Sequence, residues 1–159
     1  MKKYELTSEC KTLGNGTKLF RIRALRDFSN VKAGQLGGWV EKEGNLNHEG
    51  DAWVYDYAIV CGKARVFGNA RVYGDAIVFG NARVYGKAWV SGDAIVCGNA
   101  RVYGKAWVFG DAVISGNARV YGKANVHGNA SVFGDVWVSG DAVISGNARG
   151  LFRQSLCCN

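Results

Sequence analysis

The 18-residue stretch Gly80–Cys97, GNARVYGKAWVSGDAIVC, decides the fold of this chain, because the next 18 residues, Gly98–Ser115, read GNARVYGKAWVFGDAVIS. The shorter motif GNARVYG occurs four times, with 12, 18 and 18 residues between successive copies. Every gap is a multiple of six, which indicates a regular six-residue repeat. The four copies begin at Gly68, Gly80, Gly98 and Gly116.

The repeat follows one rule from Gly50 to Arg149: Gly, then Asn, Asp or Lys, then Ala, a variable residue, Val, and a second variable residue. Only Asp56 departs from Gly in its slot, and only Val136 departs from Ala. The Val slot holds Val or Ile from Val54 to Ile144, and no insertion interrupts the pattern. Ala-x-Val alternates as a short strand does, so we expect Ala and Val to point inward and Gly to form the corners.

The variable residue between Ala and Val sorts by chemistry only when every third hexad is compared, which predicts three hexads per coil and three flat faces. We name the faces after these columns. The Ile face carries Ile59, Ile77, Ile95, Val113 and Ser131. The Arg/Tyr face carries Arg65, Arg83, Arg101, Arg119 and Trp137. The Trp face carries Trp53, Arg71, Trp89, Trp107, Asn125 and Val143.

This pattern resembles the hexapeptide-repeat left-handed parallel β-helix, over residues 50–149. The resemblance implies an all-β triangular solenoid, here of about five coils, and the left hand is implied by that family alone. It also implies a scaffold like that of trimeric acyltransferases. The wording of the repeats, with GQLGGWVEKEGNLNHEGDAWV before them, further resembles repeat proteins of phages and prophages.

The two ends of the chain depart from the repeat. KYELTSE and KLFRIRALRDF alternate apolar and polar residues around LGNGT, so we expect a β-hairpin within an N-terminal cap of residues 1–49. A solenoid end exposes unpaired strand edges and needs such a cap. We expect the tail, residues 150–159, to cover the other end.

The composition limits the classes of possible partner but does not select one of them. The net charge of +7 permits nucleic acid, anionic metabolites or acidic proteins. The sequence has no apolar run long enough for a signal peptide at its N-terminus or for a membrane span, so we expect no membrane partner. Five cysteines without metal-site spacing favour a reducing cytoplasm.

The Ile face predicts a subunit interface, because outward Ile, Val and Phe form a contiguous apolar patch. We therefore expect a homo-oligomer, a dimer or a trimer. The alternative is that the N-terminal segment folds back across this face. The expected interface residues are Ile59, Ile77, Ile95, Val113 and Phe79.

The other two faces are the candidate binding surfaces. An Arg column beside Tyr residues could neutralise phosphates and stack bases, or the guanidinium groups could simply cover the rings of the scaffold. Exposed Trp beside Lys suits a protein partner, a nucleotide base or a sugar, or else it is buried under another segment. The candidate ligand residues are Arg65, Arg83, Arg101, Arg119, Tyr85, Tyr103, Tyr121, Trp53, Trp89, Trp107, Lys87 and Lys105.

Catalysis is the competing class of function. Acyltransferases that resemble this scaffold generally use a His base near a loop that interrupts the hexads, and the related carbonic anhydrases use three His ligands. This chain has only His48 and His127, and residues 50–149 contain no insertion. His127 stands outward in the column of Phe109 and Ser145, with no inward carboxylate to orient it. We therefore expect no catalytic residues, no metal and no cofactor.

The sequence thus favours a non-enzymatic binding protein of phage or prophage origin, acting in the host cytoplasm. Its ligand would be an anionic, nucleotide-like molecule or a host defence protein, bound through the solenoid faces. An acyltransferase-like enzyme and a structural component of a virion are the alternatives.

Overall fold

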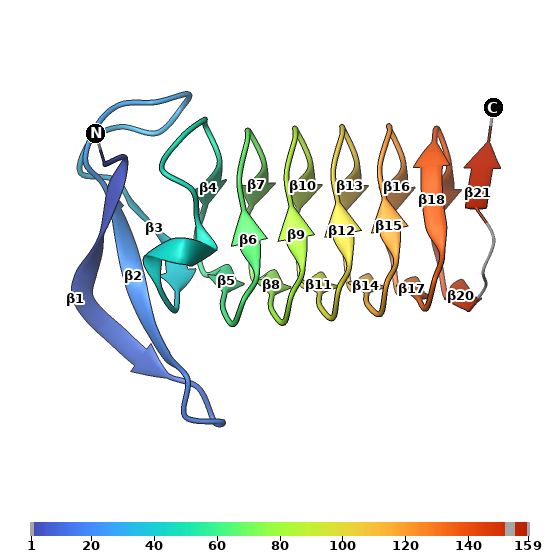
Figure 1. Cartoon of the computed structure of the whole chain (residues 1–159), viewed down its shortest axis with the longest axis horizontal. Helices are drawn as coiled ribbons and strands as arrows, with labels where there is room; N and C mark the ends of the chain where they lie inside the picture. Colours follow the sequence, from blue (N-terminus) through green and yellow to red (C-terminus); the bar gives the residue numbers. More distant parts are fainter. Residues whose placement is uncertain (1, 152–154, 159) are drawn as a thin grey trace.

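The computed structural model describes residues 2–151 and 155–158 of the chain. The backbone coils into a triangular prism of three parallel ladders, with a cap at the N-terminal end and β21 at the other (Figure 1). The expected all-β solenoid with three hexads per coil is confirmed. Two of the sheets hold six strands each, so the prism has about six coils rather than five.

The sheet of the Ile face runs on into the cap, where β1 and β2 form the expected antiparallel hairpin and β2 pairs with β3. Its strands in spatial order are β1 (Tyr4–Thr12), β2 (Lys18–Ala24), β3 (Leu36–Val40), β5 (Ile59–Val60), β8 (Ile77–Val78), β11 (Ile95–Val96), β14 (Val113–Ile114), β17 (Ser131–Phe133) and β20 (Arg149–Leu151).

The other two faces are each a ladder of short parallel strands. The Arg/Tyr face consists of β6 (Arg65–Val66), β9 (Arg83–Val84), β12 (Arg101–Val102), β15 (Arg119–Val120), β18 (Trp137–Gly140) and β21 (Ser155–Cys158). The Trp face consists of β4 (Trp53–Val54), β7 (Arg71–Val72), β10 (Trp89–Val90), β13 (Trp107–Val108), β16 (Asn125–Val126) and β19 (Val143–Ile144). The described residues contain one short 3-10 helix, η1 (Glu43–Asn45), and no helix long and apolar enough to cross a membrane.

Each coil pairs with the next in a register of 18 residues. The amide of Asn81 donates to the carbonyl oxygen of Gly98 at 2.8 Å, and that of Arg83 donates to Ala100 at 2.9 Å. The inward Val and Ala side chains are fully buried along the prism, for example Val84 and Ala88. Because the interior is filled by these small residues, only the outward positions are free to differ between coils.

The corners require glycine at the point where the chain turns from one face to the next. Gly98 has a φ of 63°, in the left-handed region that L-residues disfavour. A Cβ placed there would lie 2.9 Å from the backbone nitrogen of Gly116 in the following coil. The corner glycines are therefore set by both backbone angle and the close approach of successive coils.

The cap supplies donors to carbonyl oxygens that the first coil leaves unpaired. Buried Lys3 donates through Nζ to the carbonyl oxygens of Gly50 and Ala52, at 3.2 and 2.7 Å. Buried Asn45 donates through Nδ2 to those of Gly62 and Ala64, at 3.1 and 2.9 Å. These two polar side chains close the edges of the Trp and Arg/Tyr sheets against further pairing.

The parallel ladders extend at both ends beyond residues 50–149, the range over which the repeat rule holds. Strand β3, within the segment expected to be purely a cap, already pairs in parallel with β5. At the other end β20 and β21 pair in parallel with β17 and β18. The described part of the tail thus continues the ladders instead of covering the end, while residues 152–154 and 159 lie outside the described residues.

We predict that Gly98→Ala destabilises the fold by at least about 1–2 kcal/mol, the cost of a left-handed L-residue, because the contact with Gly116 adds to the strain. Chemical denaturation followed by circular dichroism measures the change. Gly14→Ala is the control, since no atom lies within 4 Å of a Cβ at that position. Equal stability of the two variants would contradict the close-contact account.

A second prediction concerns Lys3. Burial, with a smaller contribution from Arg26, lowers the pKa of Lys3 from 10.5 to about 8. Above pH 8 the unfolded chain therefore binds more protons at this residue than the folded chain does, so stability rises with pH through this group. We expect the free energy of unfolding to rise between pH 8 and 9.5 relative to Lys3→Met, by no more than about 1.4 kcal/mol per pH unit. A parallel pH profile for the two proteins would contradict it.

Candidate ligand groove on the Trp face

The N-terminal cap covers the first coil of the Trp face. Trp53 is fully buried, and the rings of Phe28 and Tyr4 meet it edge to face at 5.2 and 6.1 Å. Trp53, which the sequence suggested as a ligand residue, is therefore closed to any ligand on this face. Burial under another segment was the alternative that the sequence left open, and it holds for this Trp.

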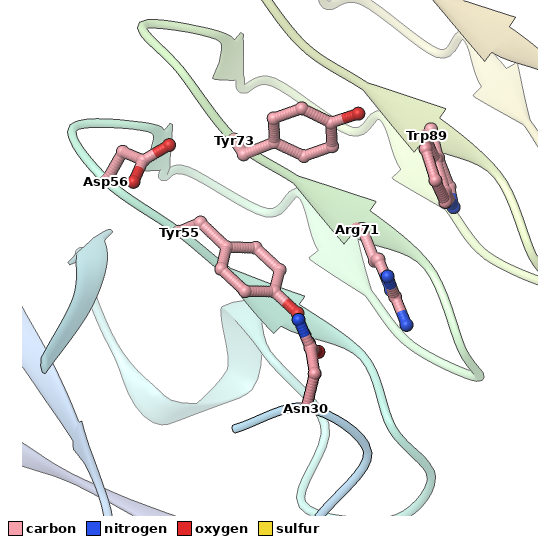
Figure 2. Close-up of a pocket in the computed structure, with 6 residues that line it drawn as sticks. All are labelled: Asn30, Tyr55, Asp56, Arg71, Tyr73 and Trp89. Carbon is pink, nitrogen blue, oxygen red and sulfur yellow. Dashed lines mark hydrogen bonds between the residues drawn. The ribbon is translucent and has the colours of Figure 1, made fainter. Parts of the chain in front are cut away.

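A loop of the cap is fastened to the first two coils of the Trp face by two side-chain hydrogen bonds. The Tyr55 hydroxyl donates to Oδ1 of Asn30 at 2.9 Å, and Nη2 of Arg71 donates to Oγ of Ser29 at 3.1 Å. Figure 2 shows Asn30 reaching the tip of Tyr55, with Arg71 and Trp89 on the neighbouring strands. The cap thus forms one wall of a depression on the face.

Three adjoining hollows follow this depression, and Trp89 lines all of them. The first, of about 210 Å³, is lined by Asn30, Tyr55, Asp56, Arg71, Tyr73 and Trp89 (Figure 2). The second, of about 190 Å³, is lined by Tyr73, Trp89, Ser91, Trp107 and Phe109. The third, of about 300 Å³, is lined by Ser29, Asp51, Asn69, Arg71, Lys87 and Trp89. We call these three hollows together the Trp groove.

The groove exists because the aromatic column is interrupted at Arg71. Trp89 and Trp107, which succeed one another in the Trp column, stack at 4.9 Å and 1°. Around Arg71 the rings meet edge to face: Tyr55 and Tyr73 at 6.1 Å and 87°, and Tyr73 and Trp89 at 6.0 Å and 74°. Edge-to-face rings do not cover one another, so part of their π-surface stays open to the hollow.

Charge in the groove is mixed. The Arg71 guanidinium lies 5.5 Å from the Trp89 ring as a cation–π pair, and Lys87 stands exposed at the adjoining corner. Asp56 occupies the one Gly slot that lacks glycine, with a φ of 53°, and its Oδ2 accepts a hydrogen bond from the Gly74 amide at 3.1 Å. Burial raises the pKa of Tyr55, so its hydroxyl stays a hydrogen-bond donor at neutral pH.

The two histidines differ in their freedom to act as a base. Nδ1 of His48 accepts from the Lys3 amide at 3.2 Å, and its Nε2 is buried 3.6 Å from Oε2 of Glu43. Both ring nitrogens of His48 are thus turned toward protein groups. His127 lies half-buried in the outward column that continues from Tyr73 and Phe109, stacked on Phe109 at 4.8 Å and 11°. His127 therefore lies one coil beyond Phe109, which lines the second hollow, and is not itself among the residues that line the groove.

The remaining predicted residues lie on the other two faces. Ile59 is buried beneath Leu19 and Trp39 of the cap, and Ile77 packs against the same cluster. Ile95 and Val113 are half-buried and Phe79 is exposed, so a subunit interface on this face stays a prediction for the later coils. The Arg/Tyr face lies outside the groove. Among the described residues no group of three His, Cys, Asp or Glu side chains is placed to hold a metal ion.

Sequence reasoning did not identify Ser29, Asn30, Tyr55, Asp56 and Tyr73 as parts of one site. The first two lie in the aperiodic cap, where no repeat rule predicts their position. Asp56 could have been noticed from the sequence, because it is the one residue other than glycine at the Gly position of the repeat.

The fold is that of a repeat parallel β-helix protein. Four stretches of this chain match the family described as "YdcK Beta solenoid repeat": residues 64–79, 78–92, 94–110 and 112–128. The chain is also similar to the Escherichia coli (strain K12) protein named "Uncharacterized acetyltransferase YdcK", at 37% identity over 82 residues. That match covers 43% of this chain and 25% of the relative, so the chain spans about a quarter of the relative's length.

This similarity corrects the expectation of a non-enzymatic protein, since the relative is named as an acetyltransferase. The expectation rested on the absence of an inserted loop within residues 50–149. That expectation did not consider the cap, whose loop forms a wall of the groove through Ser29 and Asn30 without an insertion in the repeats.

We predict that Tyr55→Phe loosens this loop, because it removes the hydroxyl bonded to Asn30 and keeps the ring. The expected loss of stability is about 1 kcal/mol, typical of one hydrogen bond, with faster amide exchange in residues 26–34. Denaturation and hydrogen exchange measure the two effects. Tyr57→Phe is the matched control because the Tyr57 ring is 65% exposed. Unchanged exchange in the Tyr55 variant would show that the bond does not fasten the loop.

Proposed function

We propose that the protein takes part in acyl-group transfer and that the Trp groove binds the nucleotide-bearing acyl donor. The observation that carries this proposal is the convergence of three hollows on Trp89, with cations and open aromatic faces around it. The name of the relative supports the reaction class. The anionic, nucleotide-like ligand expected from the sequence is retained here as the donor.

A coenzyme A thioester combines a base, phosphates and an extended thiol arm, and the groove offers a place for each part. The first hollow, between Asn30 and the edge-to-face Tyr rings, suits a base that stacks and accepts or donates hydrogen bonds. Arg71 and Lys87, which line the third hollow, suit the phosphates. The second hollow, walled by Trp89, Trp107 and Phe109, suits the arm.

In this arrangement the arm leads along the outward column toward His127. The imidazole would remove a proton from the acceptor's amine or hydroxyl as that group attacks the thioester carbonyl. The carbon–sulfur bond then breaks and the donor leaves as its thiol, which takes up a proton. Stacking on Phe109 would hold the ring in place.

Binding of a host protein, a phage origin and a place in a virion stay predictions from the sequence. The groove favours a small ligand over these, because its hollows are small, about 190–300 Å³ each, and its rings lie edge to face. An oligomer formed through Ile95 and Val113 is compatible with the donor site, since that face lies on a different side of the prism.

The proposal is tested by calorimetric titration of the protein with acetyl-coenzyme A. Arg71→Gln is expected to raise Kd about tenfold, which corresponds to about 1.4 kcal/mol for a lost charge-assisted contact. Arg83→Gln, the same substitution on the Arg/Tyr face, is the matched control and should leave Kd unchanged. Equal losses in the two variants would place the donor elsewhere.

Turnover is measured as release of free thiol from acetyl-coenzyme A in the presence of amine and hydroxyl acceptors. His127→Asn should lower the rate at least about 100-fold, the usual worth of a general base, while donor affinity stays the same. An absence of both donor binding at millimolar concentration and thiol release would refute acyl transfer.

A further inference from the structure

The charges on the prism are strongly polarised between its corners. The Lys corner, Lys87, Lys105 and Lys123, adjoins the Arg/Tyr face along one edge. The acidic corner, Asp75, Asp93 and Asp111, joins the other two faces and lies opposite the Arg/Tyr face. The prism therefore turns its regular cationic columns to one side and its acidic column to the other.

The cations of this side are not neutralised within the protein. None of the ion pairs in the described part of the chain involves Arg65, Arg83, Arg101, Arg119 or the Lys corner. Strand pairing places the four arginines in register, one per coil. Arg65 lies over the ring of Phe67 and Arg119 over that of Trp137, at 5.8 and 5.0 Å. Within the described residues none of the seven cations is paired with a carboxylate, so their charge is available to a partner.

The rings beside them are arranged so that bases have nowhere to stack. Phe67, Tyr85, Tyr103 and Tyr121 form one continuous pile, with centroids 4.7–4.9 Å apart and planes within 4°. Each inner ring is covered on both faces by its neighbours and presents only its edge and hydroxyl. This corrects the sequence-based idea of a base-stacking platform, which needs open ring faces.

The hydroxyls remain useful as donors to phosphate. Burial in the pile raises the pKa of Tyr103, so the hydroxyl keeps its proton at neutral pH. Tyr hydroxyls, guanidinium groups and ammonium groups are the usual donors to phosphate oxygens, and they position nucleic acid without reading its sequence. The neighbouring Asn81, Asn99 and Asn117 bond to one another along their column, at 3.1 Å per step, which occupies amide groups that could otherwise read bases.

The dimensions favour a duplex. The four arginines span three coil steps, about 14 Å, over which B-form DNA carries roughly eight phosphates. From Arg83 to Lys87 the chain advances by at most about 13 Å, close to the major-groove width of about 12 Å. The Arg row on the face and the Lys row at its corner can therefore reach the phosphates on both sides of one groove.

We propose that the Arg/Tyr face and the Lys corner bind double-stranded DNA through its phosphates, without preference for base sequence. This surface is separate from the Trp groove except at Lys87. DNA binding thus goes beyond acyl transfer and stands or falls independently of it.

Fluorescence anisotropy of a labelled 20-base-pair duplex tests the proposal. With six phosphate contacts, log K should fall with log salt at a slope of about −5 between 50 and 200 mM. Arg83→Gln with Arg101→Gln should reduce the slope by about 2 and weaken binding at 100 mM salt roughly 60-fold. Two duplexes of unrelated sequence should bind within about twofold of each other.

The control is Lys18→Gln with Lys32→Gln, which removes the same charge from exposed positions on the cap. An equal loss in this control, or no duplex binding by the unmodified protein at 50 mM salt, would overturn the proposal. Tighter binding of single strands than of the duplex would also overturn it. The Arg83/Arg101 variant should bind acetyl-coenzyme A normally, which separates a failure here from a failure of the donor site.

Discussion

The backbone ladder between successive coils constrains everything else in this protein. Amides such as those of Asn81, Arg83 and Tyr85 donate to carbonyl oxygens of the following coil, so the coils lie at strand spacing, about 4.8 Å apart. At that distance a corner residue larger than glycine would meet the backbone of the next coil, and the interior is filled by Ala and Val side chains. The ladder thus leaves the chain free to vary its chemistry only at the outward positions and beside the corner glycines.

The ladder also gives the prism two unlike ends. In each hexad the amides beside the corner glycine and on either side of Val donate to the following coil, so the first coil has carbonyl oxygens with no donor in a preceding hexad. Strand β3 and the side chains of Asn45 and Lys3 donate to these oxygens. The residues that close this edge also bring the loop of Ser29 and Asn30 against the Trp face. The groove is therefore a consequence of how the end is capped, and no insertion within the repeats is needed to build it.

Periodicity predicted the coil length, the inward residues and the membership of each face, because all three depend only on spacing in the sequence. It left open whether Trp53 and Ile59 are buried, because the residues that cover them belong to the aperiodic cap. Nor could spacing tell whether neighbouring rings stack or meet edge to face. Trp89 stacks on Trp107, whereas Tyr55 and Tyr73, which also share one slot in successive coils, meet edge to face beside Arg71. Stacking therefore depends on the neighbouring side chains as well as on the slot.

The motif GNARVYG illustrates this dependence on neighbours. Its copies at Gly80, Gly98 and Gly116 fall on one face, where Tyr stacks on Tyr and the ring faces are closed. The copy at Gly68 falls on the Trp face, where Tyr73 meets Tyr55 and Trp89 at their edges and a hollow opens. One heptapeptide therefore gives a continuous row of Arg and Tyr hydrogen-bond donors in one register and part of a ligand groove in the other. Its Gly, Ala and Val have the same structural role in both, and the coils above and below determine what its Arg and Tyr can bind.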